Sequence, residues 1–179
     1  NPYGDSPMSS ILKVDEIQNT GGTTGLTIDS SGRMLTPARP AFKAYIGSSG
    51  WVDLQHGHTR RIPYNTEKYD IGGCFDTTTS TFTAPVAGYY FFYANGYTHN
   101  NAGVKVIEIT TGGNDPSNGE ILALQQDDGA LGTLQVSTTH YFNAGEKCAA
   151  YLYQSNDTAN GIYSNGTPAY NQFLGYLIG

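Results

Sequence analysis

The sequence is poor in charged residues, and this shortage excludes one large class of function. Charged residues make up 13% of the chain, about half the usual share. The 9 Lys and Arg residues stand against 15 Asp and Glu residues, so the net charge is −6 with histidine neutral. A surface of this sign repels phosphate backbones, and the single basic doublet, Arg60-Arg61, is no nucleic-acid footprint. We therefore expect no binding to nucleic acid.

Long apolar runs and cysteines are also scarce. No apolar run approaches the roughly 20 residues that a membrane-spanning helix needs, so we expect no membrane span. The two cysteines, Cys74 and Cys148, are too few for a disulfide framework. Their redox state and the compartment stay open.

Sequence motifs of catalysis are missing as well. The chain has no Gly-x-Ser-x-Gly elbow, no phosphate-binding loop, no His-Glu-x-x-His and no Cys-x-x-Cys. Catalysis would need a pair of carboxylates that the sequence does not single out. We predict that the protein is not an enzyme and carries no cofactor.

Strand and turn formers, by contrast, are abundant. The chain contains 23 Gly and 14 Tyr residues with many Thr and Asn, a mixture that disfavours helices and suits strands joined by tight turns. No apolar pattern of 3.6-residue period persists for three turns. The expected strands are 41–46, 68–75, 80–84, 88–98, 103–110, 119–126, 131–142, 147–154, 160–164 and 171–178. Their spacing predicts an all-β sandwich or jelly roll over residues 41–179.

The residues before this domain are expected to form a separate segment. Residues 1–10 hold two prolines and no periodicity, which predicts a flexible lead. Met8 would make an ordinary start, so we expect residues 1–7 to be an addition ahead of the natural sequence. Residues 11–40 contain short strand candidates and a hairpin around Ser30-Ser31-Gly32. They are too few for a core of their own and must pack on something else. We place the boundary at Pro37–Pro40.

Three expected strands, 88–98, 147–154 and 171–178, are apolar on both faces. In a two-sheet sandwich one face of each strand meets the core and the other meets water, so one set of alternate side chains should be polar. If the three strands share a sheet, its outer face is an apolar slab that marks a subunit interface. We expect this interface to contain Tyr89, Phe91, Tyr93, Tyr151, Tyr153, Leu174, Tyr176 and Ile178. The alternative is that tyrosine tips simply face water, although several of these residues have no polar tip.

Seven residues at fixed intervals carry a family resemblance. They are Tyr64, Asp70, Phe75, Phe82, Gly88, Tyr90 and Phe92. Their spacing resembles the pattern of the C1q globular head, in the C1q/TNF-like jelly-roll family, with Tyr64 in place of the usual Phe and Ala94 in place of a last aromatic residue. The resemblance implies a ten-stranded jelly roll that assembles as a homotrimer. It also implies that the strands at 41–46, 88–97, 147–153 and 171–178 share the subunit-facing sheet.

The N-terminal segment has a resemblance of its own. Residues 11–20 and 26–33 are similar to N-terminal segments of phage tail-fibre and other virion proteins, in which such segments form a short β stem or dock on the particle. This implies a bacteriophage virion structural protein: a trimeric capsid decoration protein, a head fibre or a short tail-fibre knob. Residues 11–36 would attach it to other virion proteins at the virion surface. Two alternatives stay open, a receptor-binding adhesin for a host-surface glycan and a bacterial surface or secreted C1q-like protein.

Candidate metal ligands are few. His56 and His58 flank a glycine and would lie on one side of an extended segment, as metal ligands do. Asp127 and Asp128 offer oxygen ligands for a calcium ion, although the EF-hand spacing is absent and acidic loops are commonly just solvated. His140 has no carboxylate or cysteine near it in the sequence, so we expect an exposed strand residue.

Candidate recognition loops are richer. Residues 97–103 and 154–172 are rich in Tyr, Asn, Ser and Gly, a composition typical of adaptable recognition surfaces. They would contact a host glycan or protein, or serve as hydrophilic connectors.

Overall fold

The computed structural model describes residues 12–55, 57–98, 103–112, 118–128, 132–155 and 161–179. The predicted lead at residues 1–10 lies outside this range. All sixteen regular elements of the described residues are β-strands, so the all-β class is confirmed. Within the same residues no helix has the length and apolar character to cross a membrane. The chain divides into two compact units between Ala38 and Arg39.

The N-terminal unit is a three-stranded antiparallel sheet of β1 (Glu16–Gln18), β2 (Thr24–Ile28) and β3 (Met34–Leu35), in the order β1-β2-β3. The predicted hairpin joins β2 to β3. Its turn is closed by the Asp29 carboxylate, which accepts hydrogen bonds from the backbone of Ser31 and Arg33 and pairs with the Arg33 guanidinium at 2.7 Å. Gly32 adopts a φ of 77°, which glycine tolerates best.

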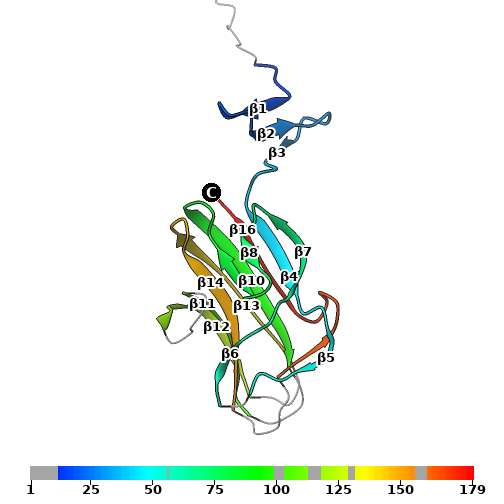
Figure 1. The fold of residues 1–179 in the computed structure, drawn as a ribbon, viewed down its shortest axis with the longest axis vertical. Helices are drawn as coiled ribbons and strands as arrows, with labels where there is room; N and C mark the ends of the chain where they lie inside the picture. Colours follow the sequence, from blue (N-terminus) through cyan, green and yellow to red (C-terminus); the bar gives the residue numbers. More distant parts are fainter. Residues whose placement is uncertain (1–11, 56, 99–102, 113–117, 129–131, 156–160) are drawn as a thin grey trace, which may run out of the picture. The chain divides into compact units, whose positions relative to one another are not determined.

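The C-terminal unit, the head, is a sandwich of two sheets (Figure 1). Sheet I has the order β5-β15-β10-β16-β4-β7, and β13 pairs with the free side of β10. Its strands are β4 (Ala41–Tyr45), β5 (Ser49–Val52), β7 (Thr66–Ile71), β10 (Gly88–Thr98), β13 (Gly132–Phe142), β15 (Ile162–Asn165) and β16 (Gln172–Leu177). Sheet II has the order β12-β11-β14-β9-β8, and β6 also pairs with β14. Its strands are β6 (Thr59–Arg61), β8 (Phe75–Asp76), β9 (Thr81–Thr83), β11 (Lys105–Thr111), β12 (Ile121–Asp127) and β14 (Lys147–Gln154).

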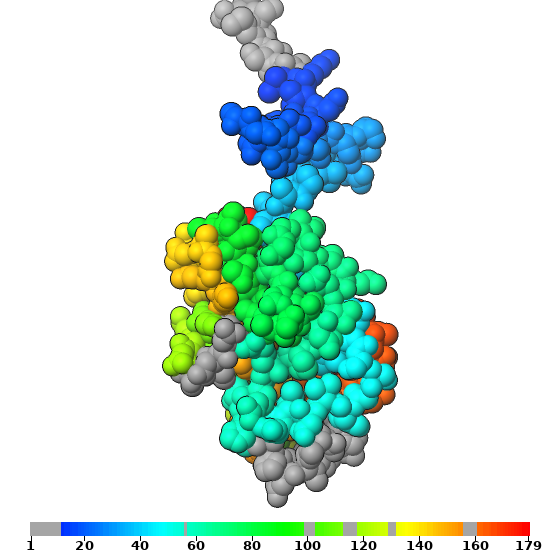
Figure 2. Space-filling view, in the orientation of Figure 1, coloured from blue at the N-terminus to red at the C-terminus, as the bar shows by residue number. Residues whose placement is uncertain are grey.

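The core lies between the sheets and is built from aromatic rings. Phe42 stacks on Phe75 with ring centroids 4.6 Å apart, and Phe173 meets Phe42 edge-on at 5.0 Å. Alternate residues of β10 point inward and are fully buried, as the two-residue period of a strand requires. In the space-filling view the segment from β7 to β9, coloured turquoise to green, covers much of the face turned to the viewer (Figure 2).

The predicted placement of the strand at 147–154 is wrong. This strand, β14, lies in sheet II between β11 on one side and β9 and β6 on the other. Its outward Tyr151 is 1% exposed and lies under the Arg61 guanidinium, 5.7 Å from the ring centroid. Tyr151 and Tyr153 therefore do not belong to the outward face of sheet I, where β13 lies beside β10 instead.

Two strands were not expected from the sequence. Residues 47–50 have turn composition, yet Ser49–Val52 forms β5 and pairs with β15. The charged Thr59–Arg61 forms β6 along β14. The expected strand at 68–75 is also divided, since β7 ends at Ile71 and β8 begins at Phe75. Neither Gly-rich nor charged segments have high strand propensity, so pairing with a neighbouring strand determines these elements.

Candidate functional site

The outward side of sheet I carries a continuous set of large side chains, which we call the apolar face. It consists of Tyr69, Ile71, Tyr89, Phe91, Tyr93, Tyr141, Leu174, Tyr176 and Ile178. Register aligns these side chains in rows across the sheet, because directly opposed residues of antiparallel strands share a face. One row runs from Phe91 through Tyr176 and Ala41 to Ile71.

Many side chains of the apolar face are about half exposed. Exposure is 57% for Tyr89, 46% for Tyr141, 44% for Tyr176 and 45% for Ile178. The rings also pack on one another, with centroids 5.3 Å apart for both Tyr89–Tyr141 and Phe91–Tyr176. Burying the remaining exposed half of such a side chain yields about 1 kcal/mol. An apolar surface of this extent is typical of a protein interface.

The polar content of the apolar face is low. Lys43 lies in a row between Leu174 and Tyr69, and β13 contributes Ser137 and Thr139. The Tyr93 hydroxyl lies 3.1 Å from the Gln135 side-chain oxygen, to which it donates a hydrogen bond. Six of the eight residues predicted for the interface lie here, whereas Tyr151 and Tyr153 lie on sheet II.

A second cluster, the aromatic group, lies where β5, β15 and the end of β10 meet. It consists of Trp51, Tyr97, Tyr163 and Tyr170. The Trp51 and Tyr163 rings are 5.0 Å apart, and Trp51 is 41% exposed. The group includes described parts of both predicted recognition loops; residues 99–102 and 156–160 of those loops lie outside the described residues.

Buried asparagines hold the backbone of the aromatic group. The Asn171 side chain accepts a hydrogen bond from the Tyr97 N–H at 2.9 Å and donates one to the Tyr163 carbonyl at 2.7 Å. The Asn95 side chain donates to the Tyr170 carbonyl at 3.2 Å. Asn171 is fully buried and Asn95 nearly so. Because these contacts fix the backbone, the three tyrosine rings start from a pre-organised arrangement.

The seven residues that carry the family resemblance have structural roles in the core and turns and do not form a ligand site. The buried Tyr64 donates its hydroxyl to the Asn95 carbonyl at 2.8 Å, and burial raises its pKa. The Asp70 carboxylate accepts hydrogen bonds from the Cys74 and Phe75 backbone at 2.9 and 3.1 Å and so closes the turn between β7 and β8. A Cβ at Gly88 would lie 2.7 Å from the end of the Leu177 side chain and 3.2 Å from the Gly179 carbonyl oxygen, so a larger residue would have to displace its neighbours. The remaining four, Phe75, Phe82, Tyr90 and Phe92, are core aromatics.

The predicted metal candidates do not assemble into a site within the described residues. No group of three or more His, Cys, Asp or Glu side chains there is close enough to hold a metal ion. His56 lies outside the described residues, and His58 and Asp128 are exposed. Cys74 and Cys148 are buried free thiols, and burial raises the pKa of each.

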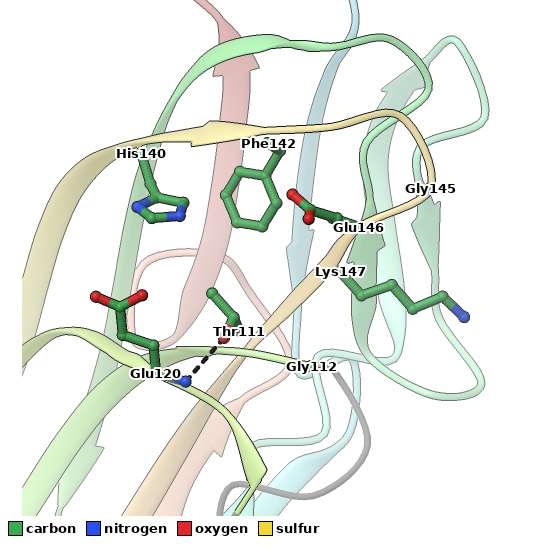
Figure 3. Close-up of a pocket in the computed structure, with 8 residues that line it drawn as sticks. All are labelled: Thr111, Gly112, Glu120, His140, Phe142, Gly145, Glu146 and Lys147. Carbon is green, nitrogen blue, oxygen red and sulfur yellow. Dashed lines mark hydrogen bonds between the residues drawn. The ribbon is translucent and has the colours of Figure 1, made fainter.

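One surface pocket is lined by His140, which the sequence predicted to be an exposed strand residue with no carboxylate near it in the sequence. His140 lines a pocket of about 470 Å³ together with Glu120 and Glu146, so carboxylates do lie near it (Figure 3). Glu146 is six positions away and could have been found from the turn that Asn143 and Gly145 signal. Glu120 comes from the other sheet, and only the fold brings it to His140.

Comparison with known proteins agrees with this architecture. The sequence pattern of the C1q domain matches residues 48–178. The globular domain of zebrafish complement 1qA protein is similar in structure, with a TM-score of 0.56, 18% identity, and coverage of 79% of this chain and 98% of that one. Murine APRIL, solved at pH 8.5, has a TM-score of 0.59, 9% identity, and coverage of 78% and 99%. No curated protein sequence is similar enough to the chain to count as a relative.

Proposed function

The chain belongs to the C1q domain family, and from this premise we propose that it is a structural protein of a bacteriophage virion. The head is a homotrimer, and the N-terminal unit attaches it to the particle. It acts as a capsid decoration protein, a head fibre or the knob of a short tail fibre, displayed at the virion surface. C1q and TNF-like domains are generally recognition or structural modules rather than enzymes, which is consistent with this role.

The apolar face of sheet I is the observation that carries the proposal. Several half-exposed side chains, each worth about 1 kcal/mol on burial, leave about 5 kcal/mol per protomer for association. C1q and TNF-like domains typically form homotrimers, so closure around a three-fold axis would bury the apolar face against identical copies of the chain.

The N-terminal unit supports attachment. Ile17 pairs with Leu26 and Ile28 with Met34, so all four side chains lie on one face of the small sheet. None of the described residues before Pro40 is buried; Met34 is 72% exposed and Ile17 50%. A sheet of three short strands with an uncovered apolar face is marginal in water and gains stability from a partner. The similarity of residues 11–20 and 26–33 to virion segments favours a particle protein as that partner.

The test is the location and copy number of the protein on purified particles, by quantitative mass spectrometry and cryo-electron microscopy. Dozens to hundreds of copies on the capsid indicate decoration, whereas a handful at the tail indicate a fibre knob. A gene neighbourhood without capsid or tail genes, together with absence from particles, would reject the virion role and favour a bacterial surface or secreted protein.

The aromatic group favours a second candidate, recognition of a host-surface glycan. Exposed aromatic rings such as Trp51, which packs on the Tyr163 ring, provide stacking surfaces for sugar rings. A glycan array probed with the full chain and with Trp51→Ala tests this. Signals that the Trp51→Ala chain loses support glycan recognition, and silence across host polysaccharides counts against it.

A further inference from the structure

Asparagine–glycine pairs occur in very different surroundings within the described residues. Those in which both residues are described are Asn95-Gly96 in β10, Asn118-Gly119 before β12 and Asn165-Gly166 at the end of β15. Such a pair can react without an enzyme, because the glycine nitrogen can attack the side-chain carbon of the asparagine and close a five-membered ring. Glycine has no Cβ to hinder this closure and allows the backbone rotation that it needs. The surroundings of each pair therefore decide whether it reacts.

The first two pairs are held in place by the fold. Asn95 is 5% exposed, and its side-chain oxygen accepts the Gln172 N–H at 2.8 Å. Gly96 is paired with β13 along the length of β10. Gly119 packs closely on β11, since a Cβ there would lie 2.0 Å from the Thr111 carbonyl oxygen. Ring closure at either pair requires the backbone to leave these contacts first.

The side chain of Asn165 is instead exposed and activated. Asn165 is the last residue of β15, and its Oδ1 accepts two hydrogen bonds from Thr167, one from the N–H at 3.1 Å and one from the hydroxyl at 2.7 Å. When a nucleophile attacks the side-chain carbon, negative charge develops on this oxygen. Two donors already directed at it stabilise that charge in the manner of an oxyanion hole.

The attacking nitrogen also has a partner for its proton. The Gly166 N–H donates a hydrogen bond to the Ser164 hydroxyl oxygen at 3.1 Å, and this hydroxyl donates to the Ile46 carbonyl at 2.9 Å. Ser164 is fully buried, so its hydroxyl has a fixed position. An acceptor beside the N–H assists the loss of the proton that the nitrogen must give up on attack.

We propose that Asn165 is a site of self-catalysed deamidation. The Gly166 nitrogen forms a bond to the Asn165 Cγ while the Cγ–Nδ2 bond breaks. The proton of the Gly166 N–H is transferred through water to the departing nitrogen, which leaves as ammonia, and a succinimide remains. A second water molecule then opens the succinimide at one of its two carbonyl carbons, which yields aspartate or isoaspartate.

The product changes the surface next to the aromatic group. Asn165 and Tyr163 lie on the same face of β15, because side chains two apart in a strand share a face. On the neighbouring strand β5, Trp51 is opposite Tyr163 and Ser49 is opposite Asn165. Deamidation therefore adds one negative charge beside these rings, and isoaspartate also lengthens the main chain by one methylene group. The surface would change with the age of the protein and without a second enzyme.

Peptide mass spectrometry of the native full-length chain, incubated at pH 8 and combined with detection of isoaspartate, tests the proposal. Asn165 should convert at least about tenfold faster than Asn95 and Asn118, because the backbone of those two pairs must open first. Thr167→Ala removes one of the two donors and should slow conversion of Asn165 about fivefold. The matched control Thr167→Ser keeps the hydroxyl and should keep the rate. Thr167 is exposed, so both variants should fold.

Denatured samples of the same three chains complete the experiment. Without the turn, Asn165 should convert at the same rate in all of them. Three results would overturn the proposal. The first is an Asn165 that stays intact in the native chain while the denatured chain converts. The second is equal conversion of Asn165 and Asn118 in the native chain, since exposure alone would then explain the reaction. The third is a Thr167→Ala chain that reacts as fast as the Thr167→Ser chain, or that is slowed equally in denaturant.

Discussion

Replacing Tyr176 by Asp is the sharpest test of the apolar face. Tyr176 lies on β16 between Phe91 and Ala41 and is 44% exposed in the single chain. Because the site is already half in water, the substitution should change the stability of the isolated fold by about 1 kcal/mol or less. In a trimer closed over this face, the same change buries one carboxylate per protomer.

The magnitude follows from desolvation. Burying an unpaired ion costs several kcal/mol even after relaxation, so three copies cost on the order of 10 kcal/mol per trimer. That offsets about two thirds of the association free energy that the apolar face offers, which is about 5 kcal/mol per protomer or about 15 kcal/mol per trimer. We therefore expect the Tyr176→Asp chain to be monomeric at micromolar concentration.

Sedimentation equilibrium between 1 and 50 μM provides the measurement. The unsubstituted chain should have a mass of about 58 kDa, three times 19.2 kDa, and the Tyr176→Asp chain 19.2 kDa. The matched control is Leu124→Asp, at a position that is 54% exposed on β12 of sheet II; it should remain a trimer. If the unsubstituted chain itself sediments at 19.2 kDa, or if both variants behave alike, the reasoning from the apolar face is wrong.

Three further predictions concern the interior. A Cβ at Gly175 would lie 2.6 Å from the Phe92 ring and 2.8 Å from Phe42, so Gly175→Ala should destabilise the head by about 1–3 kcal/mol in chemical denaturation; an unchanged midpoint would show that the rings move aside freely. Burial raises the pKa of Glu108, so its ionised form opposes folding; Glu108→Gln should raise the melting temperature at pH 7 and not below about pH 4, and equal gains at both pH values would exclude ionisation as the cause. Since Cys74 and Cys148 are buried thiols with raised pKa values, a thiol reagent at pH 8 should label neither before denaturant is added; rapid labelling of the native chain would contradict their burial.

Side-chain alternation predicted correctly which residues of β10 point outward. Tyr90, Phe92 and Ala94 are fully buried, whereas Tyr89 and Phe91 lie on the apolar face. The two-residue period of a strand is a local property of the backbone, so it can be read without knowing the neighbours.

Side-chain alternation gave a wrong prediction for the outward face of β14. Both faces of this strand are apolar, as expected, but the outward Tyr151 is covered by Arg61 rather than by a second subunit. An apolar strand face indicates that something covers it, but it does not indicate which element or subunit does so. The partner depends on which strands lie on either side, and that is decided by long-range pairing between β14, β11 and β6.

The pocket at the edge of the sandwich shows the same limit for polar residues. His140 and Glu146 are close in sequence, but Glu120 reaches them only because the start of β12 in sheet II lies near the end of β13 in sheet I. None of these three residues belongs to a spaced motif, so no sequence pattern could indicate that Glu120 lies near the other two.

The sequence by itself determined the class of fold, the family and the inward and outward sides of the main strands, because backbone propensity and side-chain period are local. Only the tertiary structure decided which strands share a sheet, which apolar surface stays uncovered and which charged groups meet. Those outcomes depend on contacts between residues far apart in the chain, and such contacts form only when the two sheets pack.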